Sequence, residues 1–107
     1  MATPGSESIV LINVFRVAPE NQRKLVDLLT RATEESVGRA PGFLSAKLHR
    51  SLDGGKVTMY AEWTGIAAYE AMRGNPAAGS ALEQALSIAT FEPGIYEVVR
   101  TFLPSRP

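Results

Sequence analysis

The sequence predicts an α+β fold of the ferredoxin-like type, with an antiparallel sheet and elements in the order βαββαβ. Two neighbouring segments with strand patterns are separated by a turn that contains consecutive glycines, which is typical of an antiparallel hairpin. Helical periodicity precedes and follows this hairpin, and a strand pattern stands near each end of the chain. Each helical segment therefore connects two strands of one sheet.

The first strand is expected over Ser8–Val17, where β-branched residues dominate and both alternating faces are largely apolar. Such a strand needs cover on both sides, and in a chain of 107 residues a second subunit is the obvious source of the second cover. Pro19 suits the first turn of a helix, and leucines then recur at helical spacing. These residues predict a helix over Pro19–Val37.

The middle of the chain forms the predicted hairpin. A turn at 40–42 leads into a strand over Phe43–Ser51, and Asp53-Gly54-Gly55 then turns the chain into a strand over Lys56–Trp63. The second helical segment is expected in two parts, Gly65–Arg73 and Ala77–Ala89, because Gly-Asn-Pro lies between them. Together these parts form one bent crossover.

The last predicted strand covers Ile95–Leu103 and follows a Pro-Gly turn. Residues 1–107 are expected to form a single domain whose core extends from about residue 8 to residue 103. No apolar run reaches the roughly 20 residues of a membrane span, and the first eight residues do not resemble a secretory leader. The sequence therefore predicts a cytoplasmic protein with no membrane partner.

Composition excludes several kinds of function. Eleven basic residues balance eleven acidic ones, so the charge excess typical of proteins that bind nucleic acid is absent. The chain has no cysteine and one histidine, which argues against disulfides, iron-sulfur clusters and a metal site. His49 lies beside basic residues and is expected at the surface rather than as a catalytic base.

Asn13 is the least expected residue of the first strand, because an amide among aliphatic and aromatic residues is unfavourable to bury without partners. Two interpretations stay open. The amide is satisfied by a neighbouring side chain or water, or it faces a cavity where it orients a ligand hydroxyl or stabilises an oxyanion. Asn13 shares a strand face with Phe15, and Trp63 shares one with Met59. We expect Asn13 and Trp63 to line one pocket between the sheet and the helices.

Trp63 is the single tryptophan of the chain and ends the third predicted strand. It is either a core aromatic or a flat wall for an aromatic ligand, with an indole N–H that can donate. Phe15, Met59, Tyr69 and Met72 are the further candidates for contact with a hydrophobic substrate, and each also fits ordinary packing.

The order and spacing of four segments resemble a known family. These segments are INVFRV at 12–17, PENQ at 19–22, APGFLSAKLHRSLDG at 40–54 and VTMYAEW at 57–63. The chain resembles the antibiotic biosynthesis monooxygenase family of the dimeric α+β barrel superfamily, over about residues 9–99. This resemblance implies a homodimer in which two sheets face each other.

Cofactor-independent members of this family oxidise phenolic or anthrone rings of aromatic polyketides to quinones with molecular oxygen. They have a first-strand Asn and a third-strand Trp, which Asn13 and Trp63 match. The resemblance therefore implies these two catalytic residues, a small aromatic substrate, molecular oxygen and no cofactor. Many relatives have a second Asn four residues before the Trp, where this chain has Met59. Quinone formation then rests on Asn13 and Trp63 alone, or it is lost.

Two other functions stay open. Haem-degrading relatives share the Asn and the Trp but add an iron-binding histidine on the following helix, and the segment 65–73 contains no histidine. A non-catalytic dimeric barrel that binds a small hydrophobic ligand fits the same fold, because one fold supports unrelated functions.

Overall fold

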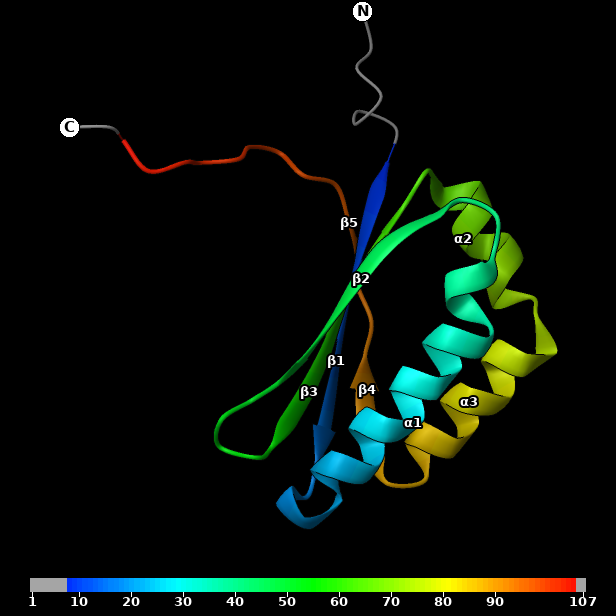
Figure 1. Cartoon of the computed structure of the whole chain (residues 1–107), viewed down its shortest axis with the longest axis vertical. Helices are drawn as coiled ribbons and strands as arrows, with labels where there is room; N and C mark the ends of the chain where they lie inside the picture. Colours follow the sequence, from blue (N-terminus) through cyan, green and yellow to red (C-terminus); the bar gives the residue numbers. More distant parts are fainter. Residues whose placement is uncertain (1–7, 106–107) are drawn as a thin grey trace, which may run out of the picture.

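The computed structural model describes residues 8–105 of the chain. This part has two layers, since one antiparallel sheet carries the α-helices on a single face (Figure 1). The strands are β1 (Ile9–Val17), β2 (Phe43–Arg50), β3 (Lys56–Trp63), β4 (Ala89–Glu92) and β5 (Ile95–Tyr96), and the α-helices are α1 (Gln22–Glu35), α2 (Ile66–Arg73) and α3 (Pro76–Leu86). The predicted α+β class and antiparallel pairing are confirmed.

β1 is the central strand of the sheet. The strand order is β2-β3-β1-β4, and β5 also pairs with β1. The register places Asn13 opposite Met59, Leu11 opposite Ala61 and Ile9 opposite Trp63. Directly paired residues of antiparallel strands point to the same face, so this register determines which side chains face the helices.

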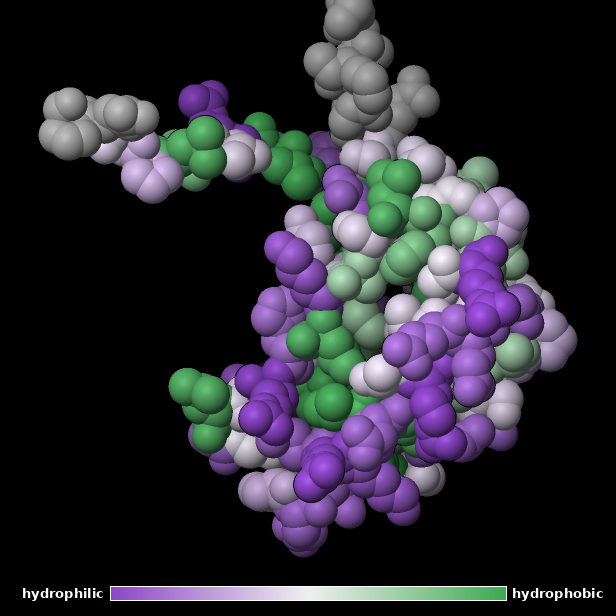
Figure 2. Space-filling model, in the orientation of Figure 1, coloured by the Kyte–Doolittle hydropathy of each residue, from purple (hydrophilic) through white to green (hydrophobic). Residues whose placement is uncertain are grey.

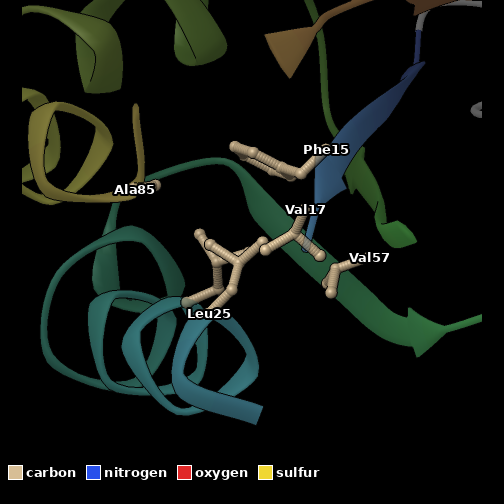
Figure 3. Packing of buried hydrophobic residues seen from close by; sticks show 6 residues of the cluster. Phe15, Val17, Leu25, Val57 and Ala85 are labelled. Carbon is tan, nitrogen blue, oxygen red and sulfur yellow. The ribbon is translucent and has the colours of Figure 1, made fainter. Parts of the chain in front are cut away.

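Buried apolar side chains join the sheet to the helices in two clusters. In the first, Phe15, Val17 and Val57 of the sheet pack against Leu25 of α1 and Ala85 of α3 (Figure 3). In α1, Leu25 and Leu29 are four residues apart, which places both on the helix face toward the sheet. The second cluster consists of Leu11, Ala61, Trp63 and Tyr69.

The hairpin between β2 and β3 is stabilised by its own side chains. Asp53 Oδ1 accepts hydrogen bonds from the Gly55 N–H at 2.9 Å and from the Ser51 hydroxyl at 2.7 Å. These two bonds, the Gly55 bond first, lower the pKa of the Asp53 carboxyl. Gly54 has φ +85°, a left-handed conformation that glycine adopts without strain, so the predicted turn at this position is confirmed.

The end of the chain differs from its prediction. The expected helix over Ala77–Ala89 ends at Leu86, and Ala89–Glu92 forms the strand β4. Short strands are difficult to detect by periodicity, and β4 is stabilised by pairing with β1 and by stacking of Phe91 on Phe15, with ring centroids 4.8 Å apart.

The predicted strand over Ile95–Leu103 is wrong beyond Tyr96. β5 contains only Ile95 and Tyr96, and Tyr96 lies opposite Val10 near the start of β1. One further step along this register reaches Ile9, where β1 begins, so residues after 97 have almost no strand left to pair with. The segment after Tyr96 has the alternating apolar residues of a strand. It has no neighbouring strand whose backbone could form the hydrogen bonds that a strand requires.

Candidate active site

A cavity of about 190 Å³ lies between the helix-covered face of the sheet and the three helices. Its wall is mostly aliphatic and aromatic, and the side chains with polar atoms are those of Asn13, Thr33, Trp63, Tyr69 and Arg73. An apolar cavity of roughly 150 Å³ is enough to admit benzene. The cavity therefore has room for an aromatic ring.

The structure brings all six predicted site residues to this cavity. Asn13 and Phe15 reach it from β1, Met59 and Trp63 from β3, and Tyr69 and Met72 from α2. The shared pocket of Asn13 and Trp63 is therefore present, while the role of each residue stays a prediction. His49 is exposed and does not line the cavity, and its Nδ1 lies 3.3 Å from the carbonyl oxygen of Thr58.

Asn13 carries an unpaired polar atom on the cavity wall. Its amide oxygen is buried and has no hydrogen-bond partner within residues 8–105. An unpaired buried acceptor costs about 1–3 kcal/mol, so a cavity occupant that donates a hydrogen bond is favoured there. Within the described residues no neighbouring side chain satisfies this oxygen, so its partner is a water or a ligand in the cavity.

Trp63 is held firmly by its aromatic neighbours. Its side chain is 1% exposed, and it makes edge-to-face contacts with Phe43 at 5.4 Å and with Tyr69 at 6.0 Å between ring centroids. No hydrogen bond joins its indole N–H to another of the described residues. Trp63 is thus both a packed core aromatic and a wall of the cavity, with a donor left unused.

Asn13 and Trp63 lie at different places along the sheet. Met59 stands opposite Asn13, and Trp63 follows Met59 by four residues on β3. Four residues of strand span about 13 Å. A ligand that touches both side chains must extend along the strand, which suits a fused-ring molecule better than a single ring.

Arg73 is a cavity residue that sequence reasoning missed. Its Nη1 donates a hydrogen bond of 2.8 Å to the Tyr69 hydroxyl, and its guanidinium carbon lies 5.8 Å from the centre of the Tyr69 ring. A signal was available, because residues four apart on a helix share a face. With Tyr69 as a candidate site residue on a helix, this spacing predicts that Arg73 lies beside it.

The described residues offer no obvious place for a metal ion. Within 8–105, no three His, Cys, Asp or Glu side chains gather closely enough to ligate one. None of the helices in the same range has the length and apolar character needed to cross a membrane.

Comparison with known proteins decides the family. Residues 8–84 match the antibiotic biosynthesis monooxygenase family. The chain belongs to this family. A relative, the tetracenomycin-F1 monooxygenase of Streptomyces glaucescens, is 38% identical over 109 residues, which cover 100% of this chain and 97% of the relative. This antibiotic biosynthesis monooxygenase domain is therefore an enzyme and a monooxygenase, as the sequence predicts.

Solved structures share its fold. A monooxygenase from the gene ActVA-Orf6 of Streptomyces coelicolor, in complex with nanaomycin D, superposes with a TM-score of 0.81 and 32% identity over 92% of this chain and 94% of that one. SnoaB, a cofactor-independent oxygenase from Streptomyces nogalater, gives a TM-score of 0.80 with 24% identity over 92% of this chain and 99% of that one. The ferredoxin-like α+β fold is confirmed by both.

Proposed function

We propose that this monooxygenase oxidises a phenolic or anthrone-type aromatic polyketide to a quinone with molecular oxygen and without a cofactor. The observation that carries the proposal is the buried, unpaired amide oxygen of Asn13 in an apolar cavity that Trp63 also lines. The tetracenomycin-F1 monooxygenase at 38% identity and the nanaomycin D complex support a substrate from antibiotic biosynthesis.

The redox balance of this reaction needs no external electrons. An anthrone and one O₂ contain the same atoms as the quinone and one water. Loss of a proton from the anthrone or phenol raises the electron density of the ring, and one electron then passes to oxygen. Recombination of the two radicals forms a carbon–oxygen bond and a peroxide, and loss of water from this peroxide leaves the quinone. The substrate is thus the reductant.

The side chains of the cavity suit this sequence of steps. The Asn13 amide oxygen accepts a hydrogen bond from a substrate hydroxyl, and its NH₂ group donates to a ring oxygen as negative charge develops. Trp63 packs against the ring system, and its indole N–H donates to the peroxide. Asn13 and Trp63 are separated along the strand direction of the sheet. A fused-ring substrate is long enough to contact both.

Asn13 is the single side-chain amide on the cavity wall, because Met59 stands where many relatives have a second Asn. A thioether is a weak acceptor and donates no hydrogen bond, so Met59 fills space beside the substrate rather than stabilising charge. In the proposed reaction, the negative charge on the substrate oxygen then depends on Asn13.

Incubation of the purified protein with anthrone tests the proposal. Quinone absorbance should appear faster than in buffer under air and should not appear under argon. Activity should persist after dialysis against a chelator, and the purified protein should be colourless. Binding of the ring without oxygen-dependent turnover would instead favour the non-catalytic barrel protein. Stoichiometric flavin or haem, together with loss of activity on its removal, would contradict the cofactor-independent reaction.

A homodimer is part of the same proposal, and a second copy is the partner that we expect. Ile12 and Val14 of β1 point away from the helix-covered face and are only half-buried, so they leave an apolar stripe on the open side of the sheet. The segment after β5 adds Val98, Val99, Phe102 and Leu103, each 60–88% exposed, and Figure 2 shows this segment as hydrophobic patches away from the body. Monomers rarely leave so much apolar surface uncovered.

A further inference from the structure

Arg73 is the one charged side chain on the wall of the cavity. Arg73 is an exposed residue at the end of α2. Its guanidinium forms no ion pair with a carboxylate of the described residues, among which Arg16 pairs with Glu92. The positive charge at the cavity is therefore not neutralised by the part of the chain that the structure describes. An anionic group can approach it without displacing a carboxylate.

The position of Arg73 on α2 directs its side chain toward Tyr69. Side chains of a helix lean toward its N-terminus, and residues four apart lie on one face. Here the side chain turns back by one helical turn, donates to the Tyr69 hydroxyl at 2.8 Å and lies over the Tyr69 ring. These contacts use one of its five N–H donors and hold the guanidinium at the cavity.

Tyr69 adds a second free donor at the same place. Its side chain is 7% exposed, and its hydroxyl oxygen accepts from Arg73. The hydroxyl hydrogen has no acceptor among the described residues. Arg73 and Tyr69 therefore each have a donor left for the cavity, and a group that accepts from both satisfies these donors.

We infer that Arg73 and Tyr69 form a subsite for an anionic oxygen group of the aromatic substrate, either a carboxylate substituent or an ionised phenol. This inference rests on the proposed function, because it concerns the substrate of the same cavity. Tyr69 contacts Trp63 at 6.0 Å, so the subsite adjoins the Trp63 end of the cavity. The anionic group then lies at this end, and the ring oxygen that Asn13 contacts lies farther along β1. By fixing the orientation of the substrate, Arg73 and Tyr69 thus determine which ring is oxidised.

Binding of anthraquinones tests the subsite without turnover. Anthraquinone-2-carboxylate and its methyl ester have the same rings and differ in charge, and quenching of Trp63, the single tryptophan, reports their binding. The wild type should bind the acid more tightly than the ester. Arg73→Met should weaken binding of the acid by roughly tenfold to hundredfold and leave the ester within about twofold. Arg73→Lys keeps the charge and should recover part of the loss.

Further arms separate the two sources of negative charge. If an ionised phenol is the natural group, 2-hydroxyanthraquinone should bind Arg73-dependently above its own pKa and not below it. Tyr69→Phe keeps the ring and should weaken binding of the anions alone. Arg23→Met removes an exposed arginine of α1 that does not line the cavity and should change nothing. Added salt should weaken binding of the acid but not that of the ester.

The outcomes that overturn the inference are distinct from those that overturn the proposed function. Equal binding of acid and ester by the wild type, equal weakening of both by Arg73→Met, or binding of neither would remove the subsite. Because the anthraquinones are already oxidised, these results do not depend on catalysis. An intact subsite with no oxidation of anthrone would contradict the proposed function alone.

Discussion

Asn13 on β1 lies directly opposite Met59 on β3, and both side chains face the cavity between the sheet and the helices. Residues opposite one another in antiparallel strands have Cβ atoms about 4.5–5.5 Å apart, so a ligand at one side chain also meets the other. The pair is chemically unequal, because Asn13 can donate and accept hydrogen bonds and Met59 offers polarisable bulk. This inequality leads to the first prediction.

Asn13→Ala should lower turnover of an anthrone by roughly 10²-fold, as expected for the loss of one oxyanion donor. The fold should survive, because the substitution also removes a buried acceptor that lacks a partner within the described residues. Met59→Leu is the matched control across the sheet, since it conserves volume and removes no hydrogen bond, and it should keep turnover within a few-fold. Initial rates of quinone formation measure both variants. Unchanged turnover in Asn13→Ala would remove its catalytic role.

The sequence predicted the site where the local pattern carried enough information. Asn13 was conspicuous because it interrupts an apolar strand, and strand alternation placed it on the same face as Phe15. Arg73 was not conspicuous, because an arginine at the end of a helix has an ordinary explanation in the helix dipole. Its spacing of four residues from Tyr69 indicated a shared helix face, but the sequence did not indicate that this face of α2 lines the cavity.

The fold was also predictable where the local sequence pattern determines an element. The hairpin, α1 and the interrupted crossover follow from turn residues and periodicity near each element. β4 was not predicted, and the predicted strand from Ile95 was too long, because the extent of both strands depends on where β1 begins and ends, which is a tertiary constraint. Ala89–Glu92 pairs with the last residues of β1, and the chain after Tyr96 passes its first residues.

The core between the sheet and α1 should account for much of the stability. Leu25 is 0% exposed and packs in the first cluster, so Leu25→Ala should lower the free energy of unfolding by about 2–5 kcal/mol. Leu52 in the hairpin is 104% exposed and provides the matched control, for which the same change should cost less than about 0.5 kcal/mol. Urea unfolding followed by Trp63 fluorescence measures both. Similar losses in the two variants would contradict this assignment of the core.

Self-association should bury the apolar residues that the single chain leaves exposed. Sedimentation at micromolar concentration should give a species of twice the chain mass of 11.5 kDa. Val14→Lys on the open face of the sheet should shift the equilibrium toward the monomer, because it places a charge in the expected interface. Thr30→Lys on the exposed side of α1 is the control and should leave association unchanged. A stable monomer in the wild type would refute the proposed dimer.

Gly79 should control the size of substrate that the cavity accepts. It lies within α3 on the cavity wall, and a Cβ added there would meet no atom within 4 Å. Glycine within a helix costs roughly 0.5–1 kcal/mol relative to alanine, so Gly79→Ala should stabilise the protein by about that amount and keep activity. Gly79→Leu should also fold, but its side chain would extend into space that a fused-ring substrate needs.

The two substitutions at Gly79 therefore separate stability from access. For Gly79→Leu we expect the KM of an anthrone to rise at least roughly tenfold, by analogy with the 1–3 kcal/mol cost of overfilling a packed site. Ser80→Leu places the same side chain on the adjacent exposed position of α3, outside the cavity wall, and should leave KM unchanged. Thermal unfolding checks that both leucine variants are folded, and steady-state rates give KM. An unchanged KM in folded Gly79→Leu would show that the substrate does not occupy this side of the cavity.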